Sequence, residues 1–205
     1  MTEKLNMYRV GILIGSFNPV HNGHLMMANY VLNEGLVDEV HFIPSPGSFG
    51  KPDLEDFYHR VQMLSLAVKD IPKVIVSDIE SELSGYTVDT LKYYKERYPN
   101  YEICLIIGKD NLEPLRRFKD SDWILSNITL LVLNRKDNDG QNFTMTATYP
   151  VISVDFPTVE ISSTVIRGYL RGGNSVWAYI PRVVEHYIKT NGLYGTSNSR
   201  EECKD

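Results

Sequence analysis

The sequence predicts an α/β fold: a single domain built on a doubly wound, Rossmann-like parallel sheet. Short apolar runs alternate with segments of helical periodicity along the chain, which is the order that builds such sheets. Several of these runs end at glycine or proline, as buried strands do. The 205 residues are enough for one domain with a proper core. We place this domain at residues 1–195 and expect the polar residues 196–205 to form a disordered tail.

The first predicted strand leads into the most informative stretch of the chain. Residues 10–14 are apolar and end at Gly15, and residues with helical spacing begin at Leu25. Between them, His21 and His24 stand three residues apart where the helix begins. A helix N-terminus attracts anions. Two imidazoles one turn apart can donate hydrogen bonds or positive charge to the same anion.

The same loop contains Gly15 and Gly23, and glycine lets the backbone approach a ligand closely. A single histidine in such a place is more often a loop cap or a packed side chain than a ligand contact. The loop as a unit favours the functional interpretation, so it predicts a phosphate-binding site.

The second predicted strand, residues 37–44, runs into a turn-rich loop at residues 44–52 whose only cation is Lys51. Open α/β sheets place ligands at the carboxyl ends of strands, where this loop lies. A solvated lysine in a mobile loop is an equal alternative. Residues 53–70 are predicted to be helical, and Arg60, beside the apolar stripe of that helix, is compatible with a plain surface charge.

Residues 73–79 form the third predicted strand, which we expect to be buried on both faces. A glycine-centred loop within residues 81–91 then leads into a helix that ends near Tyr98. Thr87 is a plausible N-cap of this helix, because its hydroxyl can accept from a first-turn N–H. The free N–H groups of the helix start should face the ligand edge of the sheet.

Residues 101–107 form a further strand that ends at Gly108, and a short helix follows. A glycine at a strand end, closely followed by a carboxylate, suits a nucleoside, with the backbone near the sugar and Asp110 accepting from its hydroxyls. Asp110 can also be the N-cap of the short helix, and the two roles are compatible.

Residues 111–127 contain Phe118 and Trp123 together with Arg116 and Arg117. Aromatic side chains beside cations can stack on a flat heterocycle, and they can equally belong to the core. The next elements are a strand at 128–134 followed by Arg135, a polar loop at 136–148 and a last strand at 151–156.

A second phosphate-like pattern begins at residue 161, where a late helix starts. Ser162 and Ser163 place hydroxyls and N–H groups at its positive end, and Arg167 offers fork-like donors one turn further. An ordinary serine cap with a surface arginine is the alternative. The convergence of this pattern with the first loop favours phosphate binding. A closing helix at 181–190 is expected to end at Gly192 as its C′ residue.

Composition narrows the class of protein. The 21 basic and 26 acidic residues give a net charge of −5, which argues against general nucleic-acid binding but not against a local basic cleft. Cys104 and Cys203 are interpreted as unpaired thiols of a reducing compartment. No apolar run is long enough to span a membrane, and residues 1–7 are too polar for a secretory signal. We therefore expect a cytoplasmic protein, or a nuclear one in a eukaryote.

The motifs resemble those of known families. Gly15 to His24 resembles the G-x-F-x-P-x-H-x-G-H motif of the nucleotidyltransferase superfamily. Three further segments resemble motifs of the nicotinate and nicotinamide mononucleotide adenylyltransferases: residues 84–91 match S-x-Y-T-x-D-T-L, residues 106–110 match I-I-G-x-D, and residues 161–167 match I-S-S-T-x-I-R. The resemblance implies transfer of an adenylyl group from ATP to a pyridine mononucleotide, giving the dinucleotide and pyrophosphate in NAD biosynthesis.

The resemblance also implies roles for individual residues. The catalytic residues would be His21, His24 and Arg167. The ATP site would comprise Gly15, Ser16, Phe17, His21, Gly23, His24, Lys51, Gly108, Asp110, Ile161, Ser162, Ser163 and Arg167. The mononucleotide site would comprise Ser16, Phe17, Lys51, Tyr86, Thr87, Phe118, Trp123 and Arg135. Magnesium would be held by substrate phosphates and water rather than by protein ligands.

Three departures from the family leave its substrate preference open. Asn18 stands where many bacterial members have aspartate, although eukaryotic members resemble the present sequence. Of a bacterial P-P-H-K loop, Lys51 alone is clearly kept. Phe118 lies about where the family has a tryptophan that stacks on the pyridine, and either Phe118 or Trp123 can fill that role. The choice between nicotinate and nicotinamide mononucleotide therefore stays open.

Other functions compete with this one. A related transferase acting on phosphopantetheine or a choline-type phosphate is the nearest alternative, and the first would lack the segment at 84–91. A non-catalytic nucleotide sensor on the same fold is another. Gly11 and Gly15 do not form the G-x-G-x-x-G of a dinucleotide-binding dehydrogenase. The expected partners are ATP and a pyridine mononucleotide, with no nucleic acid and no membrane, and a homo-oligomer stays open.

Overall fold

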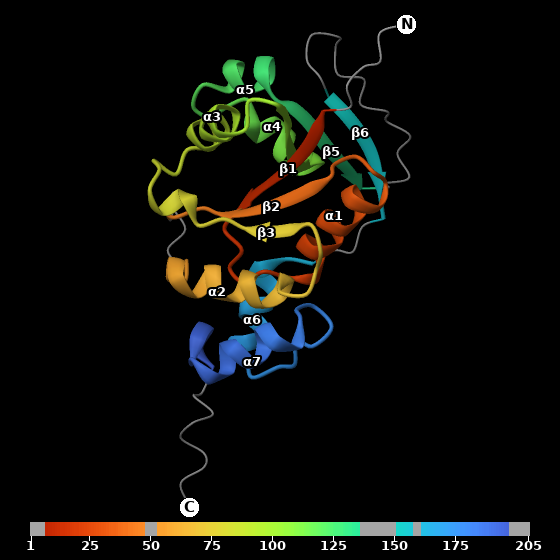
Figure 1. Cartoon of the computed structure of the whole chain (residues 1–205). Coiled ribbons are helices and arrows are strands. Elements are labelled where there is room, and N and C mark those ends of the chain that lie inside the picture. The colour runs from red at the N-terminus through yellow and green to blue at the C-terminus, as the bar shows by residue number, and fades with distance from the viewer. Residues whose placement is uncertain (1–6, 48–52, 136–150, 158–160, 197–205) are drawn as a thin grey trace, which may run out of the picture.

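The fold is built on one six-stranded, all-parallel sheet (Figure 1). The computed structural model of the chain describes residues 7–47, 53–135, 151–157 and 161–196. The spatial order of the strands is β3-β2-β1-β4-β5-β6. Their bounds are β1 Tyr8–Gly15, β2 Glu39–Pro44, β3 Val74–Val76, β4 Tyr101–Gly108, β5 Thr129–Arg135 and β6 Val151–Phe156. The doubly wound parallel sheet expected from the sequence is confirmed.

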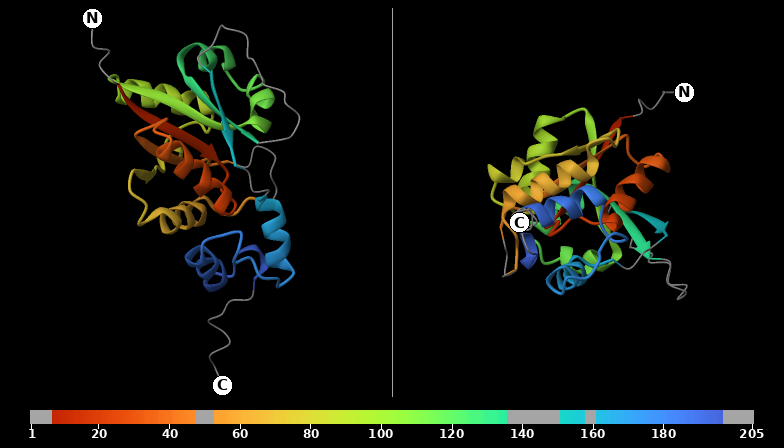
Figure 2. Two further views of the ribbon diagram at one scale, coloured as in Figure 1. Left: turned by 90° about the vertical axis from the view of Figure 1, so that its right-hand side faces the viewer. Right: turned by 90° about the horizontal axis from the view of Figure 1, so that it is seen from below.

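Helices cover both faces of the sheet, as the alternation of apolar segments requires. One buried cluster joins one face to α1 (Asn22–Asn33), α2 (Phe57–Val68), α6 (Ser163–Arg171) and α7 (Arg182–Thr190). A second cluster joins the other face to α3 (Thr87–Arg97), α4 (Leu112–Leu115) and α5 (Ser121–Asn127). Single turns of 3₁₀ helix stand at Ile79–Ser81, Lys109–Asn111 and Leu193–Gly195. Figures 1 and 2 show the second group on one side of the strands, with α6 and α7 beyond the end of the sheet.

The strand order reverses next to β1. From β1 the chain moves outward through β2 and β3, and then returns to place β4 on the other side of β1. In open α/β sheets, this reversal opens a crevice at the carboxyl ends of the two central strands. The residues that leave β1 and β4 therefore lie in the place where a ligand is expected.

Some element boundaries differ from the predictions. The third strand contains only Val74–Val76, and Ile75 is 43% exposed, so the expectation of burial on both faces is wrong. The reason is position: β3 is the edge strand and pairs with β2 alone. Thr87 is the first residue of α3, because Tyr86 occupies the N-cap position. Asp110 lies inside a 3₁₀ turn, and neither that turn nor α4 has it as N-cap.

Two other predictions concern the thiols and the membrane. Cys104 is buried in β4, and burial raises the pKa of its thiol to about 12, so it is an inert core residue. Cys203 and the polar tail from residue 197 lie outside the described residues. Within the described part of the chain, none of the helices has the length and apolar character needed to cross a bilayer.

Candidate active site

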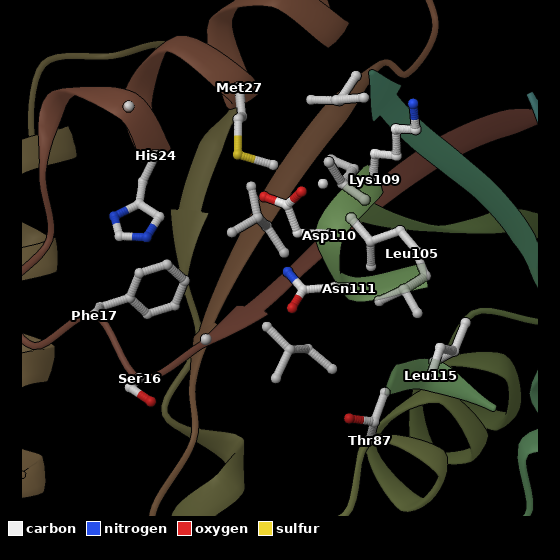
Figure 3. A pocket seen from close by; sticks show the side chains of 18 of the residues that line it. Ser16, Phe17, His24, Met27, Thr87, Leu105, Lys109, Asp110, Asn111 and Leu115 are labelled. Atoms are coloured by element: carbon white, nitrogen blue, oxygen red, sulfur yellow. The ribbon is translucent and has the colours of Figure 1, made fainter. Parts of the chain in front are cut away.

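A cavity of about 520 Å³ opens at the carboxyl ends of β1 and β4, at the point where the strand order reverses. Figure 3 shows side chains from the loop after β1, from α1, from α3 and from the β4–α4 connection around it. The cavity wall includes many of the residues predicted for the site: Gly15, Ser16, Phe17, His21, Gly23, His24, Thr87, Gly108, Asp110, Phe118 and Ile161. Residues from segments almost 150 positions apart in the chain therefore share one cavity.

The two histidines form a stacked pair at the start of α1. His21 is the N-cap residue, and the ring centroids of His21 and His24 lie 3.6 Å apart with 18° between their planes. The backbone N–H of His21 donates to Nδ1 of His24 at 3.2 Å. Since Nδ1 accepts, a neutral His24 carries its proton on Nε2. That N–H is available to an anion in the cavity.

Burial makes both rings neutral at pH 7. It lowers the pKa of His21 to about 4. It also lowers the pKa of His24 well below its ordinary value, and the neighbouring His21 ring adds to this effect. In the ligand-free site these histidines therefore act as hydrogen-bond donors rather than as cations.

The glycines of the first loop make room for side chains of the same loop. A Cβ on Gly15 would meet the ring of Phe17 at 3.1 Å, and a Cβ on Gly23 would meet the ring of His21 at 3.1 Å. Phe17 has a φ of +45°, a left-handed conformation that is uncommon for a bulky residue. Its buried ring packs edge-on against His24, with centroids 4.9 Å apart. The loop thus folds over its own glycines and holds the His24 ring in place.

The late helix closes against this loop. Ser162 occupies the N-cap position of α6, which is the alternative to its predicted phosphate role, but its side chain makes no capping hydrogen bond. The Ser163 hydroxyl donates to the carbonyl of Pro19 at 3.0 Å, and Nη1 of Arg167 donates to the carbonyl of Asn18 at 2.9 Å. Of this helix start, Ile161 lines the cavity, whereas the cavity wall does not include Ser162, Ser163 or Arg167. Nε of Arg167 is buried without a hydrogen-bond partner.

Buried polar side chains around Arg60 and Asn18 support the loop after β1. The sequence analysis did not predict this network. Arg60 is completely buried, so its interpretation as a surface charge is wrong. The side chain of Asn18 donates to the carbonyl of Asp53 at 2.8 Å and accepts from the Tyr194 hydroxyl at 2.8 Å. A signal for Arg60 existed: it stands three residues after Phe57 and four before Leu64, on the buried stripe of α2.

The other half of the cavity contains fewer of the predicted residues. Thr87 and Phe118 line it, whereas Tyr86 and Trp123 do not. The ring of Tyr86 lies under the ammonium of Lys119, 4.6 Å from its centroid. Trp123 packs against the second core cluster. Of the two aromatic candidates for stacking, the structure therefore brings Phe118 to the cavity.

The remaining predicted residues and one unpredicted cation complete the picture. Lys51 lies outside the described residues, and Arg135 is the last residue of β5. Lys109, between Gly108 and Asp110, also lines the cavity. Among the described residues it is the only lysine or arginine of the cavity wall. Its place inside the I-I-G-x-D segment was the signal that could have identified it.

Two carboxyl groups fix the loop that precedes α3, the helix that begins at Thr87. Asp89 accepts from the Ser84 hydroxyl at 2.5 Å, and the Ser84 oxygen accepts from the Tyr86 N–H at 3.2 Å. Glu80 is buried and accepts from the Thr90 hydroxyl. Burial, with the Asp89 charge second, raises the pKa of Glu80 to about 7. Within the described part of the chain, no three His, Cys, Asp or Glu side chains are grouped to hold a metal ion.

Comparison with known sequences places this site among related proteins. The chain matches the model of the cytidylyltransferase-like family over residues 12–168. It is 38% identical over 192 residues to the nicotinate-nucleotide adenylyltransferase of Bacillus subtilis, covering 92% of this chain and 99% of that protein. It is 36% identical over 190 residues to a protein of Flavobacterium johnsoniae named "Probable nicotinate-nucleotide adenylyltransferase", covering 91% and 98%.

Solved structures share the fold. The nicotinic acid mononucleotide adenylyltransferase of Plasmodium falciparum complexed with NaAD superposes with a TM-score of 0.77 at 22% identity. The same enzyme complexed with APC superposes with a TM-score of 0.76. Each comparison covers 93% of this chain and 98% of the other.

Proposed function

We propose a function on the premise that this chain belongs to the nicotinate-nucleotide adenylyltransferases of the cytidylyltransferase-like family. It transfers the adenylyl group of ATP to nicotinate mononucleotide, giving nicotinate adenine dinucleotide and pyrophosphate, a step of NAD biosynthesis. The observation that carries the proposal is the contact of the α6 start with the His21–His24 loop, beside one cavity. ATP is supplied in the cytoplasm, so we place the reaction there.

The chemistry needs no protein nucleophile. An oxygen of the mononucleotide 5′-phosphate, already anionic, attacks the α-phosphorus of ATP in line. The bond from that phosphorus to the bridging β-phosphate oxygen breaks, and pyrophosphate leaves with the electron pair. Catalysis then consists of positioning and charge stabilisation. Holding two substrates in register can supply about 7–11 kcal/mol of the barrier reduction.

The residues of the first loop act on the triphosphate. Nε2–H of His24 donates to an α-phosphate oxygen, and its strength there depends on the dry, preorganised site. Arg167 and Ser163 hold the loop by its carbonyl groups and so set its position against the triphosphate.

The nucleosides occupy the two ends of the cavity. Gly108 and Asp110 receive the ribose of ATP, and Lys109 adds a positive charge on the same side. Phe118 stacks on the pyridine ring of the mononucleotide. Thr87 opens α3, whose positive N-terminal end suits the nicotinate carboxylate better than the neutral nicotinamide.

Magnesium enters with ATP in this proposal. The described residues offer no ligand cluster for it, and Mg²⁺ commonly keeps several waters while binding substrate phosphates. When bound, it neutralises charge on the phosphate oxygens. Asp110 is the one carboxylate of the described cavity wall that could contact its water shell.

One assay tests the function. The protein is incubated with ATP and Mg²⁺ and with nicotinate mononucleotide, nicotinamide mononucleotide or phosphopantetheine in turn, and released pyrophosphate is measured. We expect turnover with nicotinate mononucleotide and slower turnover with its amide. Release only with phosphopantetheine would indicate a different transferase, and binding of ATP without turnover of any acceptor would indicate a nucleotide sensor.

A further inference from the structure

Arg60 is a fully buried cation that does not itself line the cavity. Its Nη1 donates to the carbonyl oxygens of Ser16 at 2.9 Å and Ser45 at 2.7 Å. Its Nη2 donates to the carbonyl of Pro46 at 3.3 Å, and its Nε donates to the carbonyl of Glu55 at 2.8 Å. None of the ion pairs in the described part of the chain includes Arg60, so its bonding partners there are backbone carbonyls.

Those carbonyls belong to the ends of two neighbouring strands. Ser16 follows β1 and Ser45 follows β2, and both residues line the cavity. The two strand ends are also joined directly, because the Ser45 N–H donates to the Gly15 carbonyl at 2.8 Å. A single nitrogen atom of Arg60, a residue outside the cavity wall, therefore bonds to both strand ends.

The direction of these bonds sets the direction of other donors. In a planar trans peptide the C=O and the following N–H point in opposite directions. Because the Ser16 carbonyl points at Arg60, the N–H of Phe17 points away from it. A charged donor also polarises the peptide group that it binds, which strengthens the N–H at the other end. Arg60 thus prepares a backbone donor in the loop that precedes His21.

We propose that Arg60 is a positioning residue that couples the two substrates of this site. It fixes the separation between Ser16, after β1, and Ser45 and Pro46, after β2, so that a ligand that shifts one strand end also shifts the other. This inference rests on the proposed function, because it requires ATP to contact the loop after β1 and the mononucleotide to extend from Phe118 to Ser45, which also lines the cavity. A lysine could not make the four hydrogen bonds of Arg60, because a single ammonium lacks the planar guanidinium that reaches carbonyls in three chain segments.

The test measures coupling rather than activity alone. The dissociation constant of nicotinate mononucleotide is measured by calorimetry with and without a non-hydrolysable ATP analogue. In the unaltered protein we expect the analogue to tighten mononucleotide binding by about 5-fold or more, within the usual range of coupling. In Arg60→Lys and Arg60→Met we expect this ratio to fall to about 1. A ratio in Arg60→Lys equal to that of the unaltered protein would overturn the inference.

Tyr194→Phe is the matched control. It removes a buried hydrogen bond to Asn18 in the same network but leaves all four bonds of Arg60 in place. We expect it to lower thermal stability while it keeps the coupling ratio. Loss of the ratio in this variant as well would show that the effect is general loosening, which contradicts a specific role for Arg60.

A measurement on the unaltered chain decides the matter if the Arg60 variants do not fold. The first turn of α2 does not line the cavity, and Arg60 connects it to Ser16. We expect the ATP analogue alone to slow amide hydrogen exchange at residues 58–60. Slowing confined to the cavity wall would overturn the inference. Absence of pyrophosphate release in the assay above would count against the proposed function instead, so the two failures are distinguishable.

Discussion

His21 and His24 show how burial changes what a side chain can do. The histidine pair was predictable from spacing, because two imidazoles at a helix start suit an anion. Their protonation was not predictable, since it depends on the stacking of the two rings and on their burial. The cavity therefore offers an anion a neutral donor at His24 rather than a permanent positive charge.

Replacement of His24 tests this donor directly. We expect His24→Ala to lower kcat at least a hundredfold, about 3 kcal/mol in the barrier, because one preorganised donor to the reacting phosphate is lost. Single-turnover kinetics with saturating ATP and mononucleotide measure this. His186→Ala, in an exposed position of α7, is the control and should keep full activity. Nearly full turnover in His24→Ala would remove His24 from the mechanism.

Lys109 provides a second test at a single residue. With both histidines neutral, it is the only lysine or arginine of the described cavity wall, and ATP is strongly anionic. We expect Lys109→Met to raise the KM for ATP roughly tenfold, in line with about 1.4 kcal/mol for a charge-assisted contact. Unfolding temperature should not change, and the exposed Lys69→Met should leave KM unaltered. An unchanged KM in Lys109→Met would place its ammonium outside the ATP site.

The loop before α3 makes a prediction about pH. Glu80 has its pKa raised to about 7, whereas an unfolded glutamate titrates near 4.5. Between these values the folded protein binds a proton that the unfolded chain has released, so this group makes stability fall as pH rises through the window. Glu80→Gln keeps an acceptor for Thr90 and cannot ionise. We expect it to be more stable than the parent at pH 8 by up to roughly 3 kcal/mol, and similar to it at pH 4.5.

Urea unfolding at pH 4.5, 6 and 8 measures this difference. The exposed Glu82→Gln is the control and should follow the parent at all three values. An equal stability change in Glu80→Gln at every pH would mean that Glu80 is not protonated in the folded protein.

Most elements could be predicted because their signals are local. Apolar runs ending at Gly15 and Gly108, and the helix start at Ser162, depend on neighbours in the sequence. The burial of β3 could not be predicted, because an edge position is a property of the sheet order. The N-cap position of α3 shifted by one residue, which is the ordinary uncertainty of helix boundaries.

The part of the cavity wall that the opening loop forms could be predicted, whereas the residues that support this loop could not. The sequence motifs predicted that the His24 loop and the segment at Ile161 would share one site, and both residues line the cavity. The hydrogen-bond network around Arg60 and Asn18 could not be predicted from the sequence. These side chains donate to backbone carbonyls, which every residue type has. Trp123 was an equal candidate to Phe118, because aromatic residues beside cations occur in the sequence of a core as well as in that of a binding site. The structure packs Trp123 against the second core cluster.

The molecule as a whole should respond to its substrate. A ligand that binds only the folded state at 100 times its dissociation constant adds about 2.7 kcal/mol of stability. For a chain of this length, each kcal/mol raises Tm by about 2–4 °C, so ATP should raise it by roughly 5–10 °C. Differential scanning calorimetry measures this, with sodium sulfate at equal ionic strength as the control. An equal shift with sulfate would mean that the site recognises only an anion.

The hydrogen bond from Tyr194 to Asn18 spans 176 positions of the chain, and this has a consequence for synthesis on the ribosome. Asn18 emerges before Tyr194, which is translated roughly 9 to 35 s later at ordinary elongation rates. Until Tyr194 has been translated, the Asn18 side chain lacks the hydrogen bond from the Tyr194 hydroxyl. A newly made molecule therefore reaches its full stability only after Tyr194 has left the ribosome.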